Sequence, residues 1–150
     1  MRTRTRGFTL VELLVTVAII GILAAIAIPA LNASLQRARQ KRTMVELRSV
    51  ATAVSSYATD FPFVPQVGPG DAELLRPYLV PTYIRDLSAV DAWSRPLRYQ
   101  AEGLSYTLTS LGADGVAQAN LTFGPTTSLG AEIVIANGVF VQWPDGIQAN

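Results

Sequence analysis

The chain has 150 residues, contains no cysteine and no histidine, and has a formal net charge of +1. The lack of both residue types excludes disulfides, thiolate nucleophiles and cysteine- or histidine-based metal sites, and it removes the most common general base. The remaining carboxylates, hydroxyls and single lysine form no known catalytic motif, so the sequence does not predict an enzyme.

Charge is distributed unevenly along the chain. Three arginines precede the first apolar run and four basic residues follow it, whereas residues 61–150 contain four Arg against eight Asp or Glu. An acidic second half argues against nucleic-acid binding there, because a phosphate backbone attracts basic surfaces. Residues 61–150 are sufficient for one small hydrophobic core and for no second domain.

The first apolar run extends from Leu13 to Leu31, which is long enough to cross a bilayer as a helix at about 1.5 Å per residue. We therefore predict a membrane-spanning helix. A secretory signal peptide is the main alternative, since basic residues come first and Ala25-Ile26-Ala27 imitates a cleavage site. The run continues through Leu31, which favours the membrane helix. Basic residues flank both ends, so charge alone leaves the orientation open.

One carboxylate, Glu12, lies at the start of this apolar run. A charge at the centre of a transmembrane helix costs about 2.5 to 3.5 kcal/mol, so a compensating partner is expected. The alternative is that Glu12 lies near the membrane interface and reaches toward the lipid headgroups.

Helical periodicity continues beyond the membrane segment. Residues 32–60 contain no glycine or proline, and an apolar stripe recurs at steps of three and four, at Leu47, Val50, Val54, Tyr57 and Phe61. We predict one helix from Phe8 to Asp60. Gly21 and Pro29 are its weak points because proline removes a backbone donor, so a kink or local melting is predicted near Ile22 to Pro29.

The second half of the chain is predicted to be rich in β-strands. Asp60–Asp71 contains three prolines and two glycines and is predicted as a loop. A short helix is predicted over Ala72–Tyr78, with Asp71 as its N-cap. Two hairpins and one weaker strand follow, at Leu97–Ala101 with Leu104–Leu111, at Glu132–Ala136 with Val139–Trp143, and at Leu121–Phe123.

These elements predict an α+β fold, in which a long N-terminal helix packs on a small antiparallel β-sheet head. The sheet is expected to cover the apolar stripe of the helix. The core or near-core residues predicted from the head are Trp93, Leu97, Tyr99, Tyr106 and Leu108.

The segment RGFTLVELLVTVAIIGILAAIAIP resembles the class III leader and N-terminal helix of type IV pilins and type II secretion pseudopilins. The resemblance implies that residues 1–7 are a leader peptide, that a prepilin peptidase cleaves between Gly7 and Phe8, and that the new Phe8 amine is N-methylated. It also implies that Glu12 neutralises the Phe8 amine of a neighbouring subunit, which would reward one axial register in a filament.

The same resemblance implies the topology of the chain. Residues 8–31 would form the transmembrane and filament-core helix, and residues 32–60 its amphipathic continuation. Residues 61–150 would form the globular head. The protein would cross the bacterial inner membrane once, with its N-terminus in the cytoplasm and its head in the periplasm, and the assembled filament would be periplasmic or extracellular.

The head resembles that of the major pseudopilin of type II secretion. The similar segments are PYLVPTYIRDLSAVDAWSRPLRYQ and YTLTSLGADG, and the matching positions are Asp91, Trp93, Pro96, Tyr99 and Ser110–Gly115. In that family the loop after the Gly-Ala-Asp-Gly turn wraps a calcium ion with that aspartate, a second acidic side chain and backbone carbonyls. Asp114 matches the first ligand, but Gly115–Ala131 contains no Asp or Glu. We expect no cofactor and no strong calcium site, with Asp114 as the candidate for a weak one.

These features predict a structural subunit of a pseudopilus-like filament in type II protein secretion. The implied partners are identical subunits, the prepilin peptidase, an inner-membrane assembly platform, minor pseudopilins and the membrane, with no nucleic acid. The alternative is a subunit of an extracellular type IV pilus for adhesion, motility or DNA uptake. A third is a membrane-tethered binding module, which Glu12 argues against because a lone anchor has no use for that charge.

Overall fold

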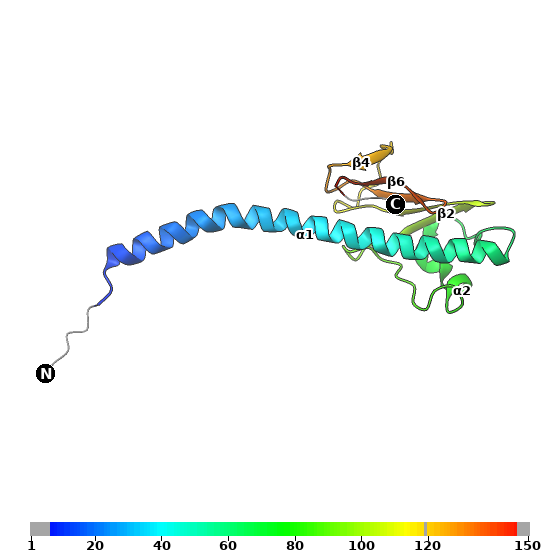
Figure 1. Cartoon of the computed structure of the whole chain (residues 1–150), viewed down its shortest axis with the longest axis horizontal. Helices are drawn as coiled ribbons and strands as arrows, with labels where there is room; N and C mark the ends of the chain where they lie inside the picture. The colour runs from blue at the N-terminus through cyan, green and yellow to red at the C-terminus, as the bar shows by residue number, and fades with distance from the viewer. Residues whose placement is uncertain (1–6, 119, 147–150) are drawn as a thin grey trace. The chain divides into compact units, whose positions relative to one another are not determined.

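The computed structural model describes residues 7–118 and 120–146 (Figure 1). The chain divides into two compact units, Met1–Leu35 and Gln36–Asn150. Residues 1–6, which make up most of the predicted leader peptide, lie outside the described residues.

The helix α1 runs from Leu10 to Asp60, which confirms the predicted long helix. It is α-helical throughout, including at Gly21 and Pro29. The local melting predicted near Ile22 to Pro29 is therefore not found. Proline removes only one backbone hydrogen bond, and the apolar residues on both sides keep theirs, so the helix continues through it. The kink stays a prediction.

Among the described residues, α1 is the one helix long and apolar enough to span a membrane. No part of its most apolar window is buried. Every large apolar side chain from Phe8 to Leu31 is at least 47% exposed. Such a surface is stable only in lipid or against other protein, as the sequence predicts.

One six-stranded sheet forms the head. Its strands are β1 (Gly70–Asp71), β2 (Arg98–Glu102), β3 (Ser105–Ser110), β4 (Gly124–Thr126), β5 (Ile133–Ala136) and β6 (Val139–Pro144), in the order β1-β2-β3-β5-β6-β4. All neighbouring strands are antiparallel except β4 and β6, which are parallel. The predicted α+β fold is confirmed.

Both predicted hairpins form, one from β2 and β3 and one from β5 and β6. Asn137 and Gly138 have φ angles of 48° and 81°, the positive values that a tight two-residue hairpin turn requires. The predicted strand at Leu121–Phe123 is wrong, because β4 begins at Gly124. The backbone N–H of Thr122 donates to the side chain of Gln142, so it is not available to a strand neighbour.

The short helix predicted over Ala72–Tyr78 is found as two pieces, the 3-10 helix η1 (Ala72–Leu75) and the α-helix α2 (Arg76–Leu79). Asp71 occupies the N-cap position but makes no side-chain cap bond. The reason is that Asp71 lies in β1, where the sheet already uses the neighbouring backbone: the N–H of Ala72 donates to the carbonyl oxygen of Leu97 at 2.7 Å.

The core of the head surrounds the C-terminal part of α1. Figure 1 shows the sheet on one side of this part of the helix and α2 on the other. The helix contributes Leu47, Val50 and Val54, which are fully buried, and Tyr57. Phe61 follows the helix and is 42% exposed, so the predicted stripe ends at Tyr57.

The predicted core residues of the sheet and its preceding loop are largely confirmed. The buried members are Leu97, Tyr99, Tyr106 and Leu108. Trp93 is half-buried and donates its indole N–H to the side-chain oxygen of Gln36 at 2.8 Å. The apolar part of an indole ring packs on a core while its polar N–H remains near the surface, so Trp93 is a near-core residue.

Candidate assembly site and head loop

The N-terminus of α1 is closed by a reciprocal pair between Thr9 and Glu12. Glu12 Oε2 accepts hydrogen bonds from the backbone N–H and from the hydroxyl of Thr9, both at 2.8 Å. The backbone N–H of Glu12 donates to Thr9 Oγ1 at 3.2 Å. This arrangement is a capping box. The Thr-x-x-Glu spacing predicts such a box. The prediction for Glu12 did not use this signal, because it considered Glu12 only as a charge in need of a partner.

The two carboxylate oxygens of Glu12 differ in their partners among the described residues. Both hydrogen bonds from Thr9 go to Oε2, and Oε1 has no hydrogen bond to any residue that the structure describes. Gly7 and Phe8 precede the helix, and both are exposed. The predicted cleavage junction therefore lies in accessible, non-helical chain, and the charge of Glu12 is held close to it by the cap.

In the head, Asp91 is a buried carboxylate that joins two loops. Its Oδ1 accepts hydrogen bonds from the backbone N–H groups of Trp93 and Arg95, both at 2.9 Å. Its Oδ2 accepts from the hydroxyl of Ser110 at 2.8 Å, and Ser110 Oγ in turn accepts from the N–H of Gly112. Three donors offset the burial of the charge. The Asp-x-Trp-x-x-Pro segment is thus tied to the turn that follows β3.

The guanidinium of Arg95 lies against the same turn. Its Nη1 donates to the carbonyl oxygen of Gly112 at 2.5 Å. A Cβ atom placed on Gly115 would lie 2.6 Å from Arg95 Cζ, so the missing side chain of Gly115 leaves the space that the guanidinium fills. The sequence did not predict this contact, because Arg95 and Gly115 are distant in the chain.

Asp114, the predicted candidate for a weak calcium site, closes its own turn. Its Oδ1 accepts a hydrogen bond from the N–H of Val116 at 3.0 Å. Its Oδ2 lies against Gly130, where a Cβ atom would come within 2.8 Å. The next acidic residue, Glu132, is 5% exposed, and its Oε1 accepts from the N–H of Gln118 at 2.8 Å.

This donor set does not fit a calcium cage. Calcium takes six to eight oxygen ligands, usually with several carboxylates. Asp114 and Glu132 each use a carboxylate oxygen to accept a backbone N–H. The residues described in the structure contain no group of three or more acidic side chains that could hold a metal ion.

Gln142 closes the segment between the turn and β5. It is 1% exposed, and its side-chain oxygen accepts from the N–H of Thr122 at 2.8 Å. Its amide nitrogen donates to Gln118 Oε1 at 3.1 Å and to the backbone oxygen of Glu132 at 3.0 Å. The sequence signal for this role is a polar residue at an inward-facing position of a predicted strand, two residues after Phe140.

Gly112→Ala is expected to destabilise the head more than Gly103→Ala. Both glycines have positive φ, 68° and 61°, which costs an L-residue about 1–2 kcal/mol. A Cβ on Gly112 would also lie 2.6 Å from the Gly130 carbonyl oxygen, whereas Gly103 has nothing within 4 Å. Overpacking adds about 1–3 kcal/mol.

The fluorescence of Trp93 and Trp143 can follow this difference during thermal unfolding of the mature chain in detergent, because both tryptophans are in the head. An equal loss of stability in the Gly112 and Gly103 variants would show that the turn is not packed as described.

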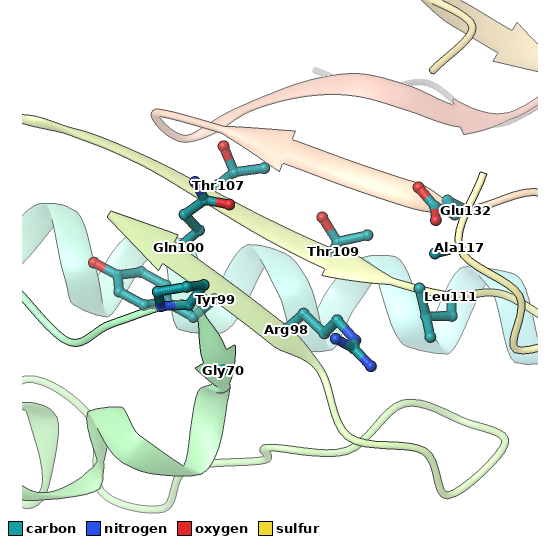
Figure 2. Close-up of a pocket in the computed structure, with 10 residues that line it drawn as sticks. Gly70, Arg98, Tyr99, Gln100, Thr107, Thr109, Leu111, Ala117 and Glu132 are labelled. Atoms are coloured by element: carbon teal, nitrogen blue, oxygen red, sulfur yellow. The ribbon is translucent and has the colours of Figure 1, made fainter. Parts of the chain in front are cut away.

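A shallow groove with a volume of about 270 Å³ lies on the outer face of the sheet. Figure 2 shows the side chains of Arg98 and Gln100 on β2 and of Thr107 and Thr109 on β3 along it. Glu132 lies at its edge, with Oε1 bonded to the N–H of Gln118. Glu132 is the one carboxylate among the described residues that line the groove, and this hydrogen bond already occupies one of its oxygens.

The chain matches two protein-family models. Residues 2–28 match the prokaryotic N-terminal methylation motif, and residues 30–122 match type II secretion system protein G. Comparison with solved structures gave no match.

The relatives of the chain include proteins of two kinds. The type II secretion system core protein G of Pseudomonas aeruginosa is 33% identical over 125 residues, which cover 76% of this chain and 87% of the relative. The core protein G of Escherichia coli is 27% identical over 134 residues, covering 89% and 91%.

The type IV major fimbrial protein FimA of Dichelobacter nodosus is 45% identical, but over only 60 residues, covering 40% of this chain and 38% of the relative. The similarity to core protein G thus extends over most of the chain, and the matched range spans the segment that holds the Asp91 network. The chain belongs to the type II secretion system protein G family of pseudopilins and carries the N-terminal methylation motif.

Proposed function

We propose that this protein, once residues 1–7 are removed, is the repeating structural subunit of a pseudopilus in type II protein secretion. The observation that carries the proposal is the order of the two family matches in one chain: a methylation motif over residues 2–28, followed by the protein G match over residues 30–122. The family is one of structural pseudopilins.

The exposed apolar surface of α1 supports a role in membrane storage followed by filament assembly. In the membrane the side chains from Phe8 to Leu31 contact lipid, and in a filament they contact the same segment of neighbouring subunits. Both environments bury apolar area, so the subunit can transfer between them without exposing that surface to water. An assembly platform in the inner membrane would drive this transfer, and the growing filament would push secreted proteins outward.

Glu12 supplies the specificity of that transfer. Cleavage after Gly7 creates a positive amine on Phe8, and Oε1 of Glu12 has no partner among the described residues. The carboxylate of one subunit can therefore bind the amine of the next while Oε2 keeps the cap with Thr9. Two charges that are each costly in an apolar environment become tolerable as a pair, which favours one axial register.

A type IV pilus subunit is the second candidate, because FimA matches 60 residues of the chain at 45% identity. Deletion of the gene in its own bacterium tests the two proposals against each other. We expect loss of secreted enzymes from the medium and their accumulation in the periplasm, with twitching motility unchanged. Loss of motility with normal secretion would support the pilus instead.

The mature protein is expected to begin at Phe8. The peptidase must reach the Gly7–Phe8 bond, which is exposed and precedes the helix. Loss of the leader removes three arginines, so the formal side-chain charge changes from +1 to −2. Intact-mass analysis of protein from cells with and without a prepilin peptidase measures this step and detects N-methylation. A mature chain that begins at Ile28 would establish the signal-peptide alternative.

A further inference from the structure

We propose that the loop after β3 is closed by the guanidinium of Arg95 and by a hydrogen-bond network of this chain's own side chains, so that the head folds without calcium. The family resemblance implies a calcium ion in this loop, and the residues present do not fit one. The proposal concerns the head alone and holds whether or not the chain assembles into a pseudopilus.

Arg95 already provides a cation at the turn. Its backbone N–H is bound to Asp91 Oδ1, and its Nη1 is bound to the Gly112 carbonyl oxygen at 2.5 Å, so both ends of the residue are held. Arginine stays protonated at all physiological pH values. The turn therefore has a permanent, covalently attached positive charge.

A calcium ion would compete with this guanidinium for the same carbonyl. Calcium binds oxygen ligands at about 2.3–2.6 Å, so an ion on the Gly112 oxygen would lie within roughly 5 Å of Arg95 Nη1. Like charges at that separation repel, and only added carboxylates could offset the repulsion. The loop offers Asp114, which caps Val116, and no other acidic residue before the buried Glu132.

Further along the loop, hydrogen bonds take the structural role that ligand bonds to an ion would have. Gln142 reaches from β6 to Gln118, Thr122 and the backbone of Glu132. Glu132 in turn accepts the N–H of Gln118. These contacts tie Gln118 and Thr122 to Glu132 and to Gln142 of β6 without an ion.

The first test measures unfolding of the mature full chain in detergent micelles, by tryptophan fluorescence, in calcium chloride and in chelator. The wild-type midpoint is expected to be the same in both solutions. Asp114→Asn is the matched variant, since an asparagine oxygen can still cap Val116 while the charge is lost, and it is expected to show no calcium effect either. A calcium-dependent rise of about 4 °C or more in the wild type, abolished in Asp114→Asn, would overturn the proposal.

The second test measures amide hydrogen exchange of peptides from residues 111–118 in Arg95 variants. Arg95→Gln is expected to raise exchange there about tenfold, and Arg95→Lys to raise it less, because lysine keeps the charge but loses the planar fork. Arg85→Gln is the control, since Arg85 is exposed and lies in the segment after α2. Unchanged exchange in Arg95→Gln would contradict the role of Arg95. If Arg95→Gln does not fold, the calcium comparison on the wild type still decides whether an ion holds the loop.

Discussion

Glu12→Gln is expected to insert into the membrane and to fold its head normally, yet to lose at least about 90% of filament yield, because breaking a buried ion pair costs about 3–5 kcal/mol. Glutamine keeps the cap, since its side-chain oxygen can accept the same bonds from Thr9 that Glu12 accepts. The substitution therefore removes the charge alone, and the Phe8 amine of the neighbouring subunit is left without its partner.

Two variants separate the charge from the cap. Glu12→Ala removes both, while Thr9→Ala keeps the charge and weakens the cap by about 0.5–2 kcal/mol. We expect Thr9→Ala to assemble better than either Glu12 variant. Sedimentation of sheared filaments measures yield, and protease resistance of the head measures folding. Normal filament yield with Glu12→Gln would show that the carboxylate serves only as a helix cap.

Asp91→Ala is expected to lower the free energy of unfolding of the head by at least about 3 kcal/mol, because three donors lose a buried, charged acceptor at a cost of about 1–3 kcal/mol each. These donors are the N–H groups of Trp93 and Arg95 and the hydroxyl of Ser110. The loss also releases the backbone of Arg95, so the turn at Gly112 should loosen with it.

The control variants for Asp91 lie at the same site and on the surface. Asp91→Asn keeps an oxygen for both N–H groups and should lose less stability than Asp91→Ala. Asp86→Ala should lose almost none, since its side chain is 93% exposed and its nearest cation is Arg76, at 3.9 Å. Tryptophan fluorescence during thermal unfolding in detergent ranks the three. Equal stability of Asp91→Ala and wild type would contradict the network.

Local patterns predicted most of the fold. The 3.6-residue period predicted α1, and the Asn137-Gly138 turn predicted the hairpin of β5 and β6. Each of these signals comes from residues that are close together in the chain. The position of β4 was not predicted because it depends on a distant partner. The side chain of Gln142 accepts the N–H of Thr122, and pairing with β6 begins at Gly124. The predicted side-chain cap by Asp71 is absent for a similar reason, because Asp71 belongs to β1 and pairs with Arg98 of β2.

The candidate site was predictable only where its residues are adjacent. The Gly7-Phe8 junction and Glu12 lie within one short motif, and their roles in cleavage and assembly stay predictions. The contacts of Asp91 with Ser110 and of Arg95 with Gly112 span 19 and 17 residues, so no local pattern shows them. The fold alone brings these pairs together.

Assembly itself provides the most direct test of the central claim that this chain is a filament subunit. The full chain should be produced in cells that contain a type II secretion assembly platform and a prepilin peptidase but no major pseudopilin of their own. Immunogold electron microscopy of sheared material is the measurement. We expect filaments labelled along their length by antibodies against the head, and only when the peptidase is present. Mature, membrane-bound protein without filaments would contradict it.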